Sequence, residues 1–525
     1  MSPALNTTTL ERHPDVSFGP PPSLYTQSAL AAETRERNRR KTWLLGLLAL
    51  VLVAALGTGG LLLWGSDDNG TRTQETAPTQ GPLDIRTTVE HQPATTVGKM
   101  AFRFSVDDLS PGESYQLPGL WATDKILAKG INKTLVGFAM GTDAAPGDEK
   151  WRLPLDGPIC GYTRHVTGDD RTAVLYAGKD EEHALCDHVA FFDLDDGEEV
   201  WSHALPVHGI GASPKKPTTD ALQDAPSVTL THDTVAVTWG GGTIAYDMDH
   251  GRQRWSTKAT GTCHDDGAAG GGALLVRQQC WSGDKNLPID SWDVLTYKIR
   301  KVDPATGRTL WTYSAAQGVR EVAVPSTAPA VLAVSAGDTG ITELLSLDDH
   351  GKNRATIRLR SGTYVGECAL QDDYTVLDYC PTVAVGAGQV FLRSKDDIAK
   401  HTTNWIIGFD LATGNTTQKF ESGPDALLVP VEVSGDRLLA LRESQDRISP
   451  SALVALDPKT GEEKPFFYFD LPPEAENFTS IDFTDVLVQD GRLFFGAKSV
   501  TGPAKGQPRW IYAVLGIESS TLKNS

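Results

Sequence analysis

Histidines and cysteines that lie close together in the chain are the residues best suited to hold a metal. His183, Cys186 and His188 have a zinc-like spacing, and Cys160 and His165 are further candidate ligands. Strong zinc motifs contain tight Cys-x-x-Cys pairs, and none occurs here. Cys160 and Cys186 follow the apolar segment at 43–64, on the side that is predicted below to be exported, and paired cysteines there favour disulfides instead. The sequence therefore predicts a disulfide beside surface histidines, with a zinc site as the alternative, and we assign no metal ligand.

Other short motifs point to turns rather than to catalysis. Asp193-Leu-Asp-Asp-Gly197 partly resembles a calcium loop but lacks the bidentate Glu that closes such a loop. Cys263-His-Asp-Asp266 is as weak a metal motif as the zinc-like group around Cys186. The sequence contains no Gly-x-Ser-x-Gly, no His-Glu-x-x-His and no phosphate-binding glycine loop. We therefore predict no catalytic residue and no cofactor-binding residue.

All six cysteines follow the apolar segment near the N-terminus, and they fall into three close pairs. An even number on the exported side of a membrane indicates disulfides. Six cysteines allow many pairings, but neighbours within one or two adjacent repeats are sterically easiest to join. The predicted bonds are Cys160–Cys186, Cys263–Cys280 and Cys368–Cys380.

A turn motif recurs along the chain and sets its architecture. In Asp303-Pro-Ala-Thr-Gly307-Arg-Thr-Leu-Trp311, Asp can bond its own backbone and Gly can take a positive φ, so the motif predicts strand, turn and strand. The full spacing returns at Asp143/Gly147/Trp151, Asp193/Gly197/Trp201 and Asp247/Gly251/Trp255. The turn returns without Trp at Asp410/Gly414 and Asp457/Gly461, and more weakly at Leu347/Gly351.

The repeats are about 50 residues apart, which is the period of a β-propeller blade with four short strands. A further strand pair near residues 491–514 lacks an outer strand, and Lys99–Asp107 resembles the outer strand of the preceding repeat. We therefore predict an all-β fold, an eight-bladed propeller whose ring is closed by residues near 99–106. A seven-bladed ring is the alternative, because Leu347 is a poor match to the motif.

The motif resembles the propeller repeats of pyrroloquinoline-quinone (PQQ) enzymes and their non-catalytic relatives, Asp-x-x-Thr-Gly-Lys-x-x-Trp, across about residues 99–518. The resemblance implies that a Trp docks each blade against its neighbour, a role carried to Trp151, Trp201, Trp255 and Trp311. Catalytic members have two adjacent cysteines beside the quinone, together with Glu, Asn and Asp around calcium. No adjacent cysteines occur here, so we expect the non-catalytic branch, without a cofactor and not an enzyme.

The N-terminal part of the chain predicts a membrane anchor. Residues 43–64 carry no charge and are about as long as the roughly 20 residues that a membrane-spanning helix needs. Basic residues just before them, from Arg35 to Lys41, predict a cytoplasmic N-terminus. A cleaved signal peptide is the alternative, but its charged leader would be unusually long. We expect a disordered tail at 1–42, the helix at 43–64, a flexible linker at 65–98, the propeller at 99–518 and a short tail at 519–525.

The net charge of −19 argues against a nucleic-acid partner, which would require a clustered basic surface. The expected protein is a single-pass cell-membrane protein whose extracytoplasmic propeller is a scaffold for a protein or ligand in the envelope. A sensor that signals to a separate cytosolic partner is the second reading, and a quinoprotein dehydrogenase with PQQ and calcium is the third. Acidic, Ala- and Gly-rich composition suits an actinobacterial envelope protein. Binding surfaces are expected at the channel mouth and in the loops at 284–293 and 394–403.

Overall fold

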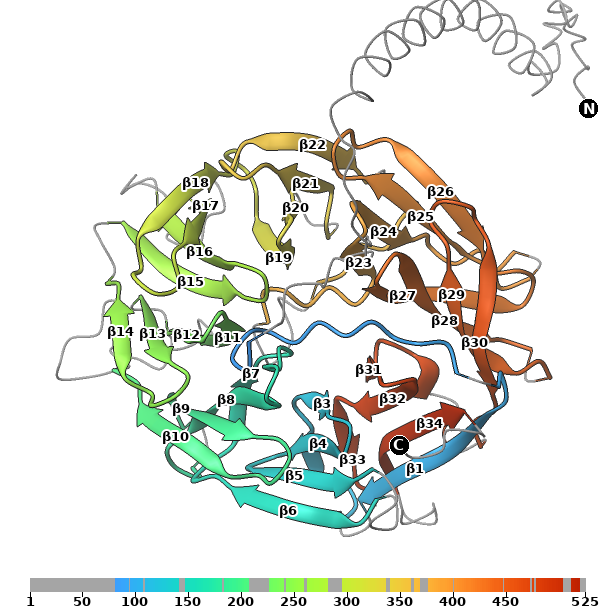
Figure 1. Ribbon diagram of the computed structural model, residues 1–525, viewed down its shortest axis with the longest axis horizontal. Helices are drawn as coiled ribbons and strands as arrows, with labels where there is room; N and C mark the ends of the chain where they lie inside the picture. Colours follow the sequence, from blue (N-terminus) through green and yellow to red (C-terminus); the bar gives the residue numbers. More distant parts are fainter. Residues whose placement is uncertain are drawn as a thin grey trace, which may run out of the picture. The chain divides into compact units, whose positions relative to one another are not determined.

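The computed structural model describes residues 81–519, except for 94, 107–108, 141–146, 182–183, 207–225, 240–241, 259–261, 282–294, 337–339, 360–362, 369–375, 400, 447, 473–474, 476–477 and 504–510. Eight four-stranded antiparallel sheets are arranged around a ring (Figure 1). The prediction of an eight-bladed, all-β propeller is confirmed, and the seven-bladed alternative is wrong.

Each blade is a meander that runs from an inner to an outer strand. Blades 1 to 4 contain β3 (Leu120–Ala122), β4 (Ile126–Ile131), β5 (Thr134–Ala139) and β6 (Glu149–Pro154); β7 (Ile159–Tyr162), β8 (Arg171–Ala177), β9 (Cys186–Asp193) and β10 (Glu199–Ala204); β11 (Ser227–Thr231), β12 (Thr234–Thr238), β13 (Thr243–Asp247) and β14 (Gln253–Ser256); and β15 (Cys263–Ala269), β16 (Leu274–Trp281), β17 (Leu295–Val302) and β18 (Thr309–Ser314).

The second half of the ring repeats this order. Blades 5 to 7 contain β19 (Glu321–Thr327), β20 (Ala330–Ser335), β21 (Glu343–Leu347) and β22 (Asn353–Arg358); β23 (Val383–Gly386), β24 (Gln389–Arg393), β25 (Trp405–Asp410) and β26 (Thr416–Glu421); and β27 (Ala426–Ser434), β28 (Arg437–Ser444), β29 (Ser451–Leu456) and β30 (Glu463–Phe469). Blade 8 contains β31 (Thr484–Gln489), β32 (Arg492–Ala497), β34 (Ile511–Ser519) and β1 (Gly98–Val106); β2 (Ser114–Gln116) and β33 (Ser499–Thr501) form a separate two-stranded ribbon.

The burial of each strand follows from its place in the blade. Middle strands pack against neighbouring blades on both faces, so β12 is buried along its whole length. Outer strands have one solvent face, and β18 buries Trp311 between exposed neighbours. The core is therefore a series of clusters between blades rather than a single centre.

The first strand of the propeller closes the ring from the opposite end of the chain. β1 pairs antiparallel with β34, from Gly98 opposite Ser519 to Val106 opposite Ile511. Phe102 on β1 is buried against the junction of blades 8 and 1. Closure removes the two sheet edges that an open array would expose, as the sequence analysis predicts for residues near 99–106.

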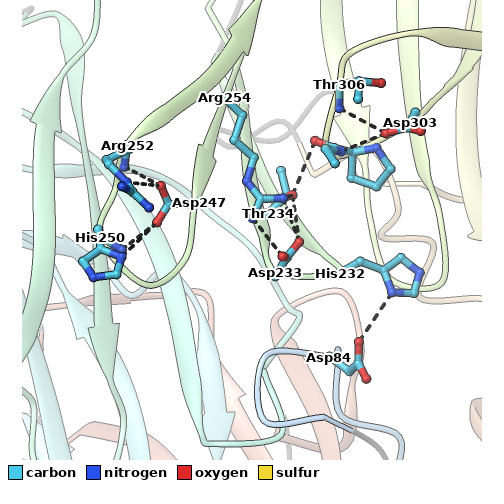
Figure 2. Close-up of polar contacts among 12 residues, drawn as sticks. Asp84, His232, Asp233, Thr234, Asp247, His250, Arg252, Arg254, Asp303 and Thr306 are labelled. Atoms are coloured by element: carbon cyan, nitrogen blue, oxygen red, sulfur yellow. Dashed lines mark hydrogen bonds and ion pairs between the residues drawn. The ribbon is translucent and has the colours of Figure 1, made fainter.

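The repeated Asp–Gly turns lie between the third and fourth strands of the blades. Gly307 has φ +72° and its N–H donates to Asp303 O at 2.9 Å, while Asp303 Oδ1 accepts from the Thr306 N–H at 3.0 Å. Asp247 caps its own turn in the same manner through His250 N (Figure 2). Glycine is required there because a positive φ costs it nothing. The Asp carboxylates of these turns therefore accept hydrogen bonds from backbone N–H groups.

The tryptophans of blades 1 to 3 join each blade to the next. Trp151 Nε1 donates to Leu194 O of blade 2 at 2.9 Å, and a Cβ on Gly197 would lie 2.5 Å from the Trp151 ring. Trp201 and Trp255 repeat this contact with Met248 O and Pro304 O.

Trp311 keeps the stacking contact, on Gly351 of blade 5, but loses the hydrogen bond. Its Nε1 is buried without a partner in the described part of the chain. The Asp348–Gly351 turn is one residue shorter than the others, because Gly351 N bonds to Asp348 O. The shorter turn displaces the backbone carbonyl that accepts the Trp hydrogen bond at the other junctions. At the junction of blades 6 and 7, Gln418 takes the place of the Trp and contacts Gly461. The Trp motif does not predict this contact.

The predicted anchor, residues 43–64, lies outside the described residues, as does the expected tail at 1–42. Of the expected tail at 519–525, Ser519 is the last residue of β34 and the rest lies outside the described residues. In the part of the chain that is described, no helix has the length and apolar character needed to cross a membrane.

Candidate functional site at the centre of the ring

A segment between blades 5 and 6 crosses the centre of the ring, and we call residues 376–380 the plug. Tyr379 belongs to the same hydrophobic cluster as Trp121 of blade 1. In blade 5, Val324 N donates to Leu377 O at 2.9 Å. The plug therefore contacts blades on opposite sides of the ring.

Asp378 fixes the plug to two further blades. Its Oδ2 lies 2.9 Å from His165 Nε2 in blade 2 and accepts from Gly270 N in blade 4 at 3.3 Å. Burial opposes ionisation of this carboxyl, but His165, the Gly270 hydrogen bond and Arg164 together outweigh burial and lower the pKa of Asp378. Asp378 is thus an ionised group whose Oδ2 is held by two blades of the ring.

Three disulfides join the pairs expected from the sequence: Cys160–Cys186, Cys263–Cys280 and Cys368–Cys380. The third ends in the plug itself, because Cys380 follows Tyr379. It closes a loop with a sequence separation of 12 residues, and such a crosslink restricts the conformations open to that loop. The bond therefore holds the plug in place at one end.

Residues 81–97, which we call the strap, run across the middle of the ring (Figure 1). Their composition predicts a flexible linker, but these residues are bound to the propeller. Leu83 O accepts from Asp233 N at 3.1 Å, and Asp84 lies 3.5 Å from His232 Nδ1 in blade 3 (Figure 2). The polar residues of this segment are typical of a solvated linker, but here they contact turns of the blades.

The second half of the strap reaches the opposite side of the ring. Arg86 pairs with Asp170 of blade 2 and donates to Gln489 Oε1 of blade 8 at 3.2 Å. Glu90 accepts from the backbone N–H groups of Asp490 and Gly491, at 3.0 and 2.6 Å. The strap therefore links blades 2, 3 and 8 before the chain enters β1.

A cavity of about 240 Å³ lies beside the plug, and we call it the central cavity. Its polar lining comes from Arg164, Asp378, Tyr379 and Glu432. Its walls are otherwise mainly apolar and come from inner strands, in particular Pro325, Val383, Val429, Val431, Ile481 and Val486. Convergent polar groups beside apolar side chains are typical of a small-molecule site.

The central cavity contains a guanidinium without a direct anionic partner. Arg164 Cζ lies 4.2 Å from the centroid of the Tyr379 ring, a cation–π distance. The Arg164 side chain is accessible within the cavity, and it forms no ion pair with Asp378 or with any other described residue. Burial opposes the charge, but Tyr379 and the nearby carboxylates outweigh it and raise the pKa of Arg164.

Glu432 faces the same cavity in its neutral form. Burial, reinforced by the negative charge of Glu90 on the strap, raises the pKa of Glu432 to about 8, while Arg164 opposes the shift. A carboxylic acid that keeps its proton at neutral pH can donate a hydrogen bond as well as accept one. The cavity therefore presents one cation and one neutral acid.

A pair of buried ionisable groups lies at the junction of blades 8 and 1. Lys129 Nζ and Asp485 Oδ1 are both buried without a hydrogen-bond partner among the described residues. Burial lowers the pKa of Lys129 to about 8, with Asp485 opposing and Lys498 contributing. Lys498 Nζ lies 5.9 Å from the centroid of the Tyr379 ring, so the surroundings of the plug are rich in cations.

One group of carboxylates in the described ranges is close enough to share a metal ion: Asp124, Asp170 and Asp195, whose oxygens lie within 4.8 Å of one another. Cations of the protein already contact two of them, Arg86 at Asp170 and Lys125 at Asp195. Burial, with Asp195 and Asp124 reinforcing it and Arg86 opposing it, raises the pKa of Asp170 to about 6. Of the three, only Asp195 lies in a motif singled out from the sequence, the Asp193–Gly197 loop, and no motif contains Asp124 or Asp170.

The zinc-like motif of the sequence does not assemble a site. Cys160 and Cys186 are bonded to each other, and a disulfide sulfur is not a thiolate ligand. His188 Nδ1 lies 2.7 Å from Asp187 Oδ1, and His183 lies outside the described residues. Asp193, in the loop that partly resembles a calcium site, accepts a hydrogen bond from Asp195 N at 2.9 Å, so it serves the turn.

The central cavity does not fit a quinone beside calcium. It is smaller than the roughly 300–1,000 Å³ of typical ligand pockets. Of its two carboxyl groups, Asp378 is bonded to His165 and Glu432 keeps its proton. Calcium requires several anionic or carbonyl oxygens, and these two do not supply them. Cys380 pairs with Cys368, twelve positions away, rather than with an adjacent cysteine.

The ring, its Asp–Gly turns and its inter-blade tryptophans define a PQQ-type β-propeller. A family model described as outer membrane protein assembly factor BamB matches residues 124–263 and 187–464. The chain belongs to this family.

Similar solved structures include an assembly factor and dehydrogenases. BamB from Moraxella catarrhalis has 11% identity and a TM-score of 0.41, covering 79% of this chain and 99% of that one. Quinohemoprotein alcohol dehydrogenase ADHIIG from Pseudomonas putida HK5 has 14% identity and a TM-score of 0.41, covering 80% and 78%. The enzyme from Comamonas testosteroni has 12% identity and a TM-score of 0.42, covering 78% and 76%. The comparison with curated proteins found no match.

Proposed function

We propose that this chain is a single-pass membrane protein whose extracytoplasmic propeller is a protein-binding scaffold in the cell envelope. Membership of a family described by an outer membrane assembly factor supports a role in protein interaction. Residues 43–64 would anchor the scaffold, with residues 1–42 in the cytoplasm.

The observation that carries this proposal is a set of exposed apolar side chains on three consecutive blades. Ile398, Ile448 and Phe483 are 79%, 89% and 65% exposed. The first two lie in loops between second and third strands of blades 6 and 7, and Phe483 precedes the inner strand of blade 8. In an antiparallel meander these connections leave the same end of the blade, so all three lie on one face of the ring. Large apolar residues on one face favour a protein partner.

The centre of the ring further favours a scaffold over a dehydrogenase. The plug and the strap, two segments of the chain itself, lie at the centre of the ring. The cavity that remains does not fit a quinone with calcium. Addition of PQQ and calcium to the purified protein should give neither quinone absorbance nor dye-linked alcohol oxidation. Either signal would contradict the scaffold.

Crosslinking on intact cells tests the scaffold directly. Full-length protein and a variant lacking residues 1–35 should yield the same crosslinked envelope protein, since the propeller makes the contact. Recovery of a partner by the full-length protein alone would assign the interaction to the tail and contradict the scaffold proposal.

The strap supports a sensor as the second candidate. It connects the centre of the ring, through Glu90 beside Glu432, to the sequence that leads back to the predicted anchor. A sensor would lose signalling on deletion of residues 1–35 while its propeller stayed folded and displayed. Unchanged signalling in that variant would reject the sensor.

A further inference from the structure

Beyond a scaffold role, the central cavity has the composition of a specific ligand site. Arg164 lies over the face of Tyr379 at 4.2 Å, a contact that uses the guanidinium face and leaves the in-plane N–H donors free. Guanidinium carries five such donors and no acceptor. The side chain is exposed to the cavity, so water serves these donors in the free protein, and an anion that enters the cavity can replace that water.

Two more deeply buried arginines lack this feature. Arg277 Nε donates to Asp266 at 2.9 Å, and Arg300 donates to Asp265 at 2.6 Å. Each of these cations is matched by a carboxylate on a neighbouring strand. Arg164 is the exception among these three, and it is the one that opens onto a cavity.

The two carboxyl groups that line the cavity do not fill the role of that missing partner. Asp378 Oδ2 is bonded to His165 and to Gly270 N. Glu432 shares the cavity with Arg164 but is held close to its neutral form by burial and by Glu90. The cavity therefore has an available cation and, in Glu432, an available hydrogen-bond donor.

The walls decide what kind of anion would fit. Although polar atoms supply most of the accessible lining, Pro325, Val383, Val429 and Ile481 also face the cavity, and contact with hydrocarbon favours an apolar body over a strongly hydrated ion such as phosphate. A guanidinium fork matches the two oxygens of a carboxylate. The combination points to a molecule with one carboxylate and a compact hydrocarbon body.

We propose that the central cavity binds a small apolar monocarboxylate, with Arg164 pairing to the carboxylate and Glu432 donating a hydrogen bond to it. The apolar body lies against the valine and proline walls, and the plug, held by Cys368–Cys380, forms one side of the site.

Calorimetric titration of the full-length protein in detergent with benzoate tests this site, with benzamide as the uncharged match and inorganic phosphate as the hydrated anion. Benzoate should bind, and benzamide and phosphate should bind at least about tenfold more weakly. Equal affinity for benzoate and benzamide, or tighter binding of phosphate, would overturn the proposal.

Variants separate the site from general electrostatics. Arg164→Gln should weaken benzoate binding by about 10- to 100-fold, the range for a lost charge-assisted hydrogen bond. Arg358→Gln, which removes an exposed arginine on β22, should leave the affinity unchanged. Unchanged affinity in Arg164→Gln would reject the proposal.

Should Arg164→Gln fail to fold, two milder variants replace it. Arg164→Lys keeps the charge but loses the fork, and it should still weaken benzoate binding severalfold. Glu432→Gln should bind benzoate and lose the decline in affinity above about pH 8 that the wild type shows as Glu432 ionises beside the ligand. Wild-type behaviour of both variants would exclude this site.

Discussion

Trp151 Nε1 donates a hydrogen bond to Leu194 O, across the junction between blades 1 and 2, at 2.9 Å. Trp311 occupies the equivalent position in blade 4, where its Nε1 has no partner among the described residues. The two rings are 9% and 8% exposed, so they differ chiefly in this bond.

Replacing each of these tryptophans by phenylalanine measures the bond. Trp151→Phe should lower the free energy of unfolding by about 1–2 kcal/mol more than Trp311→Phe does, because it leaves the Leu194 carbonyl unpaired. Denaturant unfolding of the two variants gives the comparison. An equal loss would show that stacking on the turn glycine alone joins the blades.

Ring closure should depend on Phe102, which is 4% exposed in β1. Phe102→Ala should lower the free energy of unfolding by about 3–5 kcal/mol, as expected for loss of a buried ring. Phe483→Ala, at an exposed position, should change it by less than about 0.5 kcal/mol. Similar effects of the two substitutions would mean that β1 adds little to the ring.

Glu432 should make the protein less stable as the pH rises. Burial and Glu90 raise its pKa from 4.5 to about 8, so between these values only the unfolded chain releases the proton. The stability due to this group is present below pH 4.5 and is lost as the pH rises to about 8, at a slope of up to about 1.4 kcal/mol per pH unit.

Glu432→Gln should therefore flatten the unfolding free energy between pH 5 and 8 relative to the wild type, as measured by denaturant titration at each pH. Glu421→Gln, on the exposed edge of β26, is the control and should retain the wild-type slope. A Glu432→Gln variant with the wild-type slope would show that this carboxyl ionises normally.

The disulfide at the plug should matter for the cavity as well as for stability. Replacing Cys368 and Cys380 by Ser should cost about 3 kcal/mol in the chain-entropy description and lower benzoate affinity, because the plug loses one constraint. Replacing Cys263 and Cys280, which face each other across β15 and β16, should cost similar stability without changing that affinity. Equal effects on affinity would mean that the first disulfide has no special link to the plug.

The fold could be predicted from the sequence because its repeat depends on local chemistry. Asp303 and Gly307 form their turn through bonds within one short segment, so the spacing alone indicates it. Ring closure could also be predicted, because Lys99–Asp107 resembles the outer strand of another blade. Disulfide pairs followed from proximity in the chain.

The centre of the ring could not be predicted in the same way. Arg86 meets Gln489 across a sequence separation of 403 residues, and the plug joins Asp378 to His165 across 213. No periodicity marks such contacts, and the polar composition of the strap is equally typical of a solvated linker. Arg164 is prominent only once the cavity around it is known.

Photo-crosslinking in intact cells, with the reactive side chain placed at Ile448, tests the central claim most directly. The scaffold account predicts one discrete adduct with an envelope protein from this position, and from Ile398 on the same face. Leu310, which is also exposed but lies on the outer strand of blade 4, should give none. Absence of an adduct from both loop positions, or an adduct of equal yield from Leu310, would contradict the account.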